Sequence, residues 1–361
     1  MCSKKEGKKT VFFNPRMDFN RAFSSLALRA ALALGAIPKN PVVADVFCAG
    51  GARGITYAAA LANTQKKIVF VDASPQAIKQ AKANARKAGI KKAVLACDEA
   101  NAFLASHTHE FDWVDLDPFG TPAPFIENAL RALHTARNGG VLSVTATDLA
   151  SSAGRYPAPC ERNYGARPLY CEFSHETALR ITLGAIARSA ARFDAGTEPL
   201  AAWYEEHYVK IIARVKEGTS KADASLRETG FVNYCPACGN REASEIPKEK
   251  CVACGKKQVW GGPLWLGLTS DSAFLKKMAV LAGNEKEKRF AELLFEENDS
   301  ALPPWFFDLH ELGSKLKINS PNKLALIEKL RKKGFRATRT HYSGTAIKTN
   351  AGYADLRRLI R

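Results

Sequence analysis

Five short apolar runs, separated by stretches of helical length, are the feature that most restricts the fold of this sequence. They are rich in Val, Ile, Leu and Phe, and they read VVADVF (42–47), IVFVD (68–72), AVLAC (93–97), FDWVDL (111–116) and GVLSVTA (140–146). Strands that are apolar along their whole length are typical of parallel sheets, because both faces of such a sheet are buried. Repeated strand–helix units with short links therefore predict a doubly wound α/β sheet.

The helix between the second and third runs has the clearest ends. Ser74 is suited to be its N-cap, and Pro75 stands at the first helical position. Gly89 follows the last turn and favours a stop there. The pattern therefore predicts a helix over residues 74–88.

Two further segments are expected to complete this domain: a helical pattern at 174–191 and a strand-like run at 207–215. The polar segment 216–230 follows and is the predicted boundary. We expect a large domain over residues 1–222, with an N-terminal arm, and a smaller α+β domain over residues 223–361.

The chain is strongly basic. It has 53 Lys and Arg against 36 Asp and Glu, a formal net charge of +17, and 46% of its residues are hydrophobic, enough for a sizeable core. Such an excess of positive charge suits a polyanionic partner, although a basic surface that only keeps the protein soluble is the alternative.

No secretory or membrane segment is expected. The start of the chain is polar, and the apolar stretch 26–37 is short and interrupted by Arg29. Nine cysteines, an odd number, without a secretory signal favour a reducing compartment. We expect a cytoplasmic protein.

Residues that suit a nucleotide ligand follow the first three runs. The first is followed by a glycine-rich turn (residues 48–54, CAGGARG), the second ends at Asp72, and the third leads into Asp98. Glycines let a ligand approach the backbone closely, and a carboxylate at the second strand can accept both ribose hydroxyls. Helix N-capping is the alternative role of either acid.

The fourth run leads into DLDPFG (115–120), where an acid, a proline and an aromatic resemble the signature of amino-group methyltransferases. An exocyclic aromatic amine is a poor nucleophile, because its lone pair is delocalised. A carboxylate and a carbonyl that accept its two N–H groups would localise that lone pair. We therefore assign Asp117 as the acceptor, the Pro118 carbonyl as its partner, and Phe119 as a stacking face for the base. An ordinary turn is the alternative, and Asp115 should point to the same side as Asp117.

Two C-x-x-C pairs, each followed by glycine, are separated by twelve residues: Cys235, Cys238, Cys251 and Cys254. Four thiolates on two tight turns form the tetrahedral set that structural zinc prefers, and they leave no position open for water. Iron is the second candidate. Disulfides are not expected in a reducing compartment.

The C-terminal tail combines basic and aromatic residues, a mixture that suits RNA. Helices are expected at 308–316 and 321–333, the second ending before Gly334, followed by a hairpin at 335–350 as in winged-helix domains. The candidate RNA contacts are Arg331, Lys332, Lys333, Arg336, Arg339 and Lys348, interleaved with Phe335, His341 and Tyr342.

Several long motifs, in order along nearly the whole chain, resemble the tRNA guanine-26 N2-dimethyltransferases of archaea and eukaryotes. They are VFFNPRMDFNR, DVFCAGGARGITYA, DLDPFGTPAPFIENAL, TATDLASSAGRYPAPCERNYGARP, NYCPACG, GGPLWLG and THYSGTAIKT. The resemblance implies a class I methyltransferase-like sheet that transfers one or two methyl groups from S-adenosylmethionine to guanine N2 of tRNA. The smaller domain is expected to bind zinc through its four cysteines and tRNA through its basic tail. A monomer is the expected state.

The resemblance also implies site residues. S-adenosylmethionine would be bound by Arg21, Arg53, Asp72, Asp98 and Glu99, Asp117 would be catalytic, and Phe12 and Phe119 would hold the target base between them. This chain departs from the family pattern at two places: Ala22 stands where an acid is expected after Arg21, and Gly50 where a serine is common.

Three other functions are open. An acid–Pro–Phe signature also fits methyltransferases that act on DNA adenine or ribosomal RNA. A nucleic-acid-binding regulator on an inactive enzyme fold would explain the tail. A dinucleotide oxidoreductase would explain the glycine turn and Asp72, but not the segment 117–120.

Overall fold

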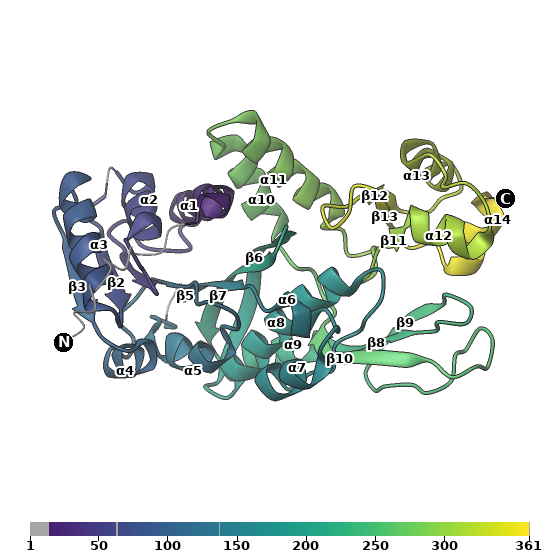
Figure 1. Ribbon diagram of the computed structural model, residues 1–361, viewed down its shortest axis with the longest axis horizontal. Coiled ribbons are helices and arrows are strands. Elements are labelled where there is room, and N and C mark those ends of the chain that lie inside the picture. The colour runs from purple at the N-terminus through teal and green to yellow at the C-terminus, as the bar shows by residue number, and fades with distance from the viewer. Residues whose placement is uncertain (1–13, 63, 137, 361) are drawn as a thin grey trace, which may run out of the picture.

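The computed structural model describes residues 14–62, 64–136 and 138–360, and its central element is a seven-stranded sheet (Figure 1). The strand order is β3-β2-β1-β4-β5-β7-β6. Strands β1 to β5 are parallel, and β7 is antiparallel to both of its neighbours. The bounds are β1 (Val42–Val46), β2 (Lys67–Asp72), β3 (Ala93–Cys97), β4 (Trp113–Leu116), β5 (Gly140–Ala146), β6 (Ala195–Glu205) and β7 (Tyr208–Glu217).

Helices cover both faces of this sheet, and a separate apolar core lies on each face. One core includes α4 (Ala100–Ser106), α5 (Ala123–Ala132) and α8 (Ser174–Ala191). The other includes α1 (Asp18–Ala33), α2 (Ala52–Ala60), α3 (Pro75–Lys87), α10 (Ser272–Leu281) and α11 (Glu285–Glu297). The short helices η1 (Pro15–Met17), α6 (Leu149–Ser152) and α7 (Pro157–Tyr164) complete this part. The predicted doubly wound sheet is confirmed.

The helix that was predicted most sharply forms as expected. The Ala77 N–H donates to Ser74 Oγ at 3.3 Å, so Ser74 is the N-cap of α3, and Gly89 follows with φ of +69°. The helix at 174–191 is also confirmed, as α8. Strand β6 was not predicted, because Glu198 and Pro199 interrupt its apolar pattern; its pairing with β7 shifts register between Pro199 and Ala201.

The polar segment 216–230 contains a helix, α9 (Thr219–Arg227), and the start of β8. Ser225 anchors α9 to β6, because its Oγ accepts the Thr197 N–H at 2.8 Å. The predicted division after residue 222 falls within α9. It stays a prediction.

The C-terminal part contains two small sheets, which Figure 1 shows at the right. One has the order β10-β8-β9: β8 (Thr229–Tyr234), β9 (Arg241–Ser244) and β10 (Val259–Trp265). The other has the order β11-β13-β12: β11 (Phe307–Asp308), β12 (Ala337–Arg339) and β13 (Ala346–Thr349). Helices α12 (Leu309–Leu316), α13 (Lys323–Lys332) and α14 (Tyr353–Ile360) share a core with the second sheet. Both predicted helices and the hairpin are confirmed, and Gly334, with φ of +85°, follows α13.

None of the helices in the described ranges combines the length and the apolar character that crossing a bilayer requires.

Candidate active site at the carboxyl ends of the strands

Four loops meet at one edge of the sheet, because β3, β2, β1 and β4 are parallel neighbours. Asp72 joins two of these loops. Its carboxylate accepts the Ala49 N–H from the loop after β1 and the Ser74 N–H from its own loop, both at 2.9 Å. Ser74, not Asp72, caps α3, so the capping alternative does not explain Asp72. Each of its oxygens can accept a further hydrogen bond, as two ribose hydroxyls would require.

The glycine-rich turn after β1 has the backbone of a ligand loop. Phe47, Ala49 and Gly51 have φ values of 69°, 47° and 78°, and α2 begins directly afterwards. Asn84 Nδ2 donates to the Gly50 carbonyl at 2.8 Å and braces the loop from α3. A Cβ on Gly54 would collide with the buried ring of Phe70, so the first turn of α2 packs directly on the sheet. Helix α2 begins directly after the turn, so its first N–H groups lie near the carboxyl end of β1, where a ligand can meet them.

Asp98 and Glu99 follow β3, and both are exposed. The Asp98 N–H donates to the Asp72 carbonyl at 3.2 Å, which places the two loops side by side. Glu99 is the N-cap of α4, since its carboxylate accepts the Ala102 N–H at 3.0 Å. Helix N-capping, the alternative considered for Asp72 and Asp98, is thus performed at α4 by Glu99 instead.

Arg21 lies on α1, and its side chain is only 13% exposed. It forms an ion pair with Asp18 and donates to the Asn14 carbonyl at 3.0 Å. An acid one turn before Arg21 thus holds the guanidinium, although Ala22 stands where the family pattern has an acid. Phe12, the other residue predicted in this arm, lies outside the described residues.

Asp117 lies just beyond β4, with its side chain 24% exposed, and it forms an ion pair with Arg53 Nη2. Arg53 is buried; its Nη1 donates to Asn20 Oδ1 at 2.8 Å, and its Nε lies 3.6 Å from Asp115 Oδ1. Although burial alone would lower the pKa of Arg53, Asp117 and Asp115 raise it well above the usual value. The guanidinium is therefore a permanent cation that fixes the Asp117 carboxylate.

Pro118 and Phe119 differ in exposure. Pro118 is buried, whereas 82% of Phe119 is exposed. The structure thus presents a carboxylate and an aromatic ring at the end of β4, next to the cofactor-type loop.

Asp115, which we expected on the same side as Asp117, is fully buried. Its carboxylate accepts hydrogen bonds from Ser143 Oγ at 2.7 Å, Lys210 Nζ at 3.1 Å and the Tyr57 hydroxyl. Burial would raise the pKa of Asp115, but Lys210 and Arg53 outweigh it and lower the pKa below 3.8. Asp115 is therefore a buried anion beneath the site, and the sequence did not reveal its partners Lys210 and Tyr57.

Asp45 is the third acid of this group. Burial, followed by repulsion from Asp115, raises its pKa to about 7. Its Oδ2 accepts the Gly54 N–H at 2.8 Å. Asp45 is therefore largely neutral below pH 7, which leaves Arg53 and Lys210 to balance Asp115 and Asp117.

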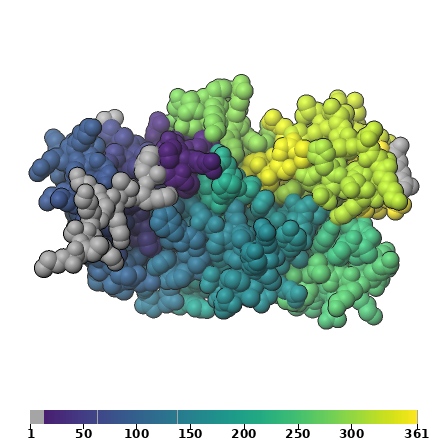
Figure 2. Space-filling view, viewed as in Figure 1, coloured from purple at the N-terminus to yellow at the C-terminus, as the bar shows by residue number. Residues whose placement is uncertain are grey.

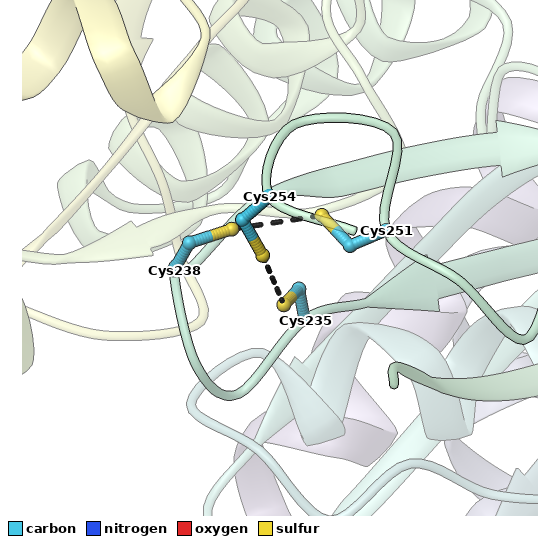
Figure 3. Close-up of side chains that lie close together, drawn as sticks. All are labelled: Cys235, Cys238, Cys251 and Cys254. Atoms are coloured by element: carbon cyan, nitrogen blue, oxygen red, sulfur yellow. Dashed lines mark hydrogen bonds between the residues drawn. The ribbon is translucent and has the colours of Figure 1, made fainter. Parts of the chain in front are cut away.

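The four predicted cysteines converge from two similar turns (Figure 3). Their sulfurs all lie within 4.8 Å of one another, and two pairs are 3.6 Å apart: Cys235 with Cys254 and Cys238 with Cys251. Sulfurs about 2.3 Å from a tetrahedral zinc ion would be about 3.8 Å apart. The donor set therefore fits zinc, and it is the one cluster in the described ranges that could hold a metal.

Several basic side chains of the C-terminal tail form ion pairs with acidic side chains of the same protein, which the sequence did not suggest. Arg336 and Arg339 form ion pairs with Asp299 at 2.6 Å and with Glu296 at 2.8 Å. Lys348 is buried, so it cannot contact RNA as predicted. Its Nζ lies 2.5 Å from Glu176 on α8, which ties the hairpin to the large sheet.

Glu176 also pairs with Arg180 at 2.9 Å, one turn along α8. Arg180 Nη1 in turn donates to the carbonyls of Trp265 at 3.0 Å and Gly267 at 2.8 Å. This joint connects α8, β10 and the C-terminal hairpin.

Comparison with known proteins agrees with this geometry. The family model for N2,N2-dimethylguanosine tRNA methyltransferases matches residues 3–361. The chain belongs to this family.

Relatives in the family align along almost the full length. The tRNA (guanine(26)-N(2))-dimethyltransferase of Methanothermobacter thermautotrophicus is 35% identical, over 99% of this chain and 94% of that protein. The Pyrococcus furiosus protein of the same name is 36% identical, over 95% and 90%. Trm1 from Pyrococcus horikoshii, solved with S-adenosyl-L-methionine, superimposes with a TM-score of 0.86 at 32% identity, over 97% and 94%.

Proposed function

We propose that this protein dimethylates the N2 amine of guanine 26 in tRNA, with Asp117 as the residue that orients the amine. The observation that carries this proposal is the partly exposed Asp117 carboxylate, which Arg53 fixes beside the cofactor-type loop. Membership of the family and the shared fold support the reaction, the substrate and the cofactor.

S-adenosylmethionine, when bound, supplies the methyl group from its sulfonium. We propose that Asp72 accepts the ribose hydroxyls, because its two oxygens keep acceptor capacity at the end of β2. Asp98 and Glu99, exposed on the adjacent loop, would contact the adenine end, and Arg21 would face the cofactor from α1. Arg53 Nη2 carries two N–H groups, and one of them pairs with Asp117. We propose that the other N–H contacts the cofactor.

Asp117 and the Pro118 carbonyl would each accept one N–H of the guanine amine. These two hydrogen bonds hold the lone pair toward the incoming methyl group, and Asp117 can take the proton that the amine loses. Phe119 and Phe12 would stack on the two faces of the base, which must leave the RNA stack to reach the site. Arg53 holds the carboxylate in place through their ion pair, so little reorganisation is needed during transfer.

Three further features belong to the proposal. The four cysteines would hold a structural zinc ion, since the site offers no position for water. The C-terminal part would contribute to tRNA binding, and the protein would act as a monomer in the cytoplasm.

Methyl transfer from labelled S-adenosylmethionine to unmodified tRNA, followed by nucleoside analysis, tests the function. Wild type should yield N2-methylated guanosine. Asp117→Ala and Asp117→Asn should lower kcat by roughly 100-fold or more, while S-adenosylhomocysteine still raises the melting temperature. Asp223→Ala, an exposed acid on α9, is the matched control.

Other outcomes would support the alternative functions. Label in an adenosine would indicate the adenine methyltransferase. Intact tRNA binding without transfer would indicate a binding protein. Thermal stabilisation by NAD, and not by S-adenosylhomocysteine, would indicate the oxidoreductase.

A further inference from the structure

The segment after β5, residues 147–170, belongs to a long family-like motif but has no role in the mechanism above. It contains α6 and α7, which lie near the middle of the face shown in Figure 2. Two large aromatic side chains stand out from it: Tyr156 is 57% exposed and Tyr170 is 78% exposed. Exposed tyrosines at this density beside an active site point to a binding surface.

This segment is fixed to the loop that carries Asp117. Gly120 N–H donates to Thr147 Oγ1 at 2.9 Å, and Thr147 N–H donates back to the Gly120 carbonyl at 3.0 Å. The buried Tyr164 hydroxyl donates to Asp148 at 2.9 Å and accepts from Thr121 Oγ1 at 3.0 Å. The loop after β4 and helix α7 therefore form one hydrogen-bonded unit.

The two exposed tyrosines lie on adjoining backbone. A Cβ on Gly154 would be 2.7 Å from the Tyr170 backbone nitrogen, so residues 154–156 abut the backbone at Tyr170. The Arg155 guanidinium lies 5.7 Å from the centre of the Tyr156 ring. The two tyrosines therefore project from neighbouring stretches of backbone, and a cation lies beside one of the rings.

Segment 147–170 has three exposed arginines and one exposed acid, Glu161. Arg155, Arg162 and Arg167 are all exposed, and none of them forms an ion pair with another described residue. Arginines paired with acids, such as Arg336 and Arg339, are already neutralised, so they attract phosphate less. Unneutralised arginines next to exposed rings match the chemistry of an unstacked RNA strand.

We propose that Tyr156 and Tyr170, with Arg155, form a stacking surface for the nucleotides next to the target guanine. It rests on the proposed function, because extrusion of the target base leaves its neighbours without a stacking partner. The tyrosine rings would replace the lost base stacking, and Arg155 would meet the adjacent phosphate. The surface would thus help to hold the RNA strand open beside Asp117.

The experiment measures KM and kcat for unmodified tRNA, and the Kd for the same tRNA with S-adenosylhomocysteine present. Tyr156→Ala and Tyr170→Ala should each raise the Kd and KM by roughly 5-fold or more, with a much smaller change in kcat. Tyr156→Phe and Tyr170→Phe keep the rings and should stay near wild type. Val280→Ala, at an exposed apolar residue on α10, is the control.

Unchanged Kd and KM in both alanine variants would overturn the proposal and would favour a protein partner for the exposed rings. The proposal would also be overturned if the phenylalanine variants were as impaired as the alanine variants. Binding would then depend on hydrogen bonds of the tyrosine hydroxyls and not on stacking. Equal melting temperatures exclude misfolding as the cause. The Kd can be measured without methyl transfer. A wild-type protein that binds tRNA but does not methylate guanine would therefore contradict the proposed function and leave the stacking surface to be judged from the Kd values.

Discussion

Lys210 on β7 extends its ammonium to 3.1 Å from the Asp115 carboxylate on β4, and both side chains are fully buried. Strand β5 separates these strands in the sheet, so the ion pair passes beneath one strand. Asp115 also lies 3.6 Å from Arg53 Nε, which connects this buried pair to Asp117. Lys210 therefore satisfies Asp115 and leaves the Arg53 guanidinium available to fix the catalytic candidate.

Removing Lys210 should destabilise the protein strongly. Lys210→Met leaves a buried anion with less compensation, so we expect the free energy of unfolding to fall by about 3–5 kcal/mol in urea denaturation. Lys216→Met, on the same strand, is the control, because Lys216 pairs with Glu198 near the surface at 3.5 Å and should cost less than about 1 kcal/mol. Equal losses in the two variants would contradict a special role of the buried pair.

Asp45 should make stability depend on pH. Its pKa is about 7 when folded and 3.8 when unfolded, so the folded state binds the extra proton between these values. Stability from this group is therefore present at low pH and is lost as pH rises toward 7. Asp45→Asn imitates the neutral form, so its free energy of unfolding should not change with the titration of this group. Between pH 5 and pH 8 the wild type should therefore lose about 2–3 kcal/mol of stability relative to the variant. A constant difference would show that Asp45 is ionised throughout.

Asp72 should control cofactor affinity. Asp72→Ala removes both proposed ribose contacts and the brace on Ala49, so S-adenosylhomocysteine should no longer raise the melting temperature at concentrations that stabilise wild type by several degrees. Asp223→Ala should respond as wild type does. A normal ligand shift in Asp72→Ala would remove this residue from the site.

Zinc should be bound with one ion per chain and should stabilise the fold. Cys235→Ser or Cys251→Ser should lower the metal content and the melting temperature together, because metal binding contributes directly to folding. Cys97→Ser is the control, since Cys97 is exposed and lies outside the cluster. Full zinc content in the serine variants would exclude this site, and iron in its place would support the second candidate.

Strands β1 to β5, the cysteine set and the acids after β2, β3 and β4 could be predicted from the sequence, because each depends on a local pattern. Ser74, Pro75 and Gly89, for example, specify the ends of α3 within fifteen residues. The order of the strands in the chain also placed Asp72, Asp98 and Asp117 at one edge of the sheet.

The charge pairing could not be predicted, because it joins residues that are distant in sequence. Lys210 lies in a strand that looks apolar, 95 positions from Asp115, and only the folded sheet shows that they meet. Arg336 and Arg339 look like RNA contacts until Glu296 on α11 and Asp299, just after that helix, prove to be their partners. A basic composition therefore predicts a negatively charged partner, but it does not predict which Lys and Arg side chains are left without an acidic neighbour in the fold and can bind that partner.

The joint between Glu176, Arg180 and Lys348 has a consequence for how the chain is made. Glu176 and Arg180 are synthesised before their partners, because Trp265 and Gly267 lie 85 and 87 positions after Arg180, and Lys348 lies 172 positions after Glu176. The charged side chains of α8 therefore gain these partners only after β10 and the C-terminal hairpin have been made. Burial of α8 is in this way coupled to formation of β10 and of the C-terminal hairpin.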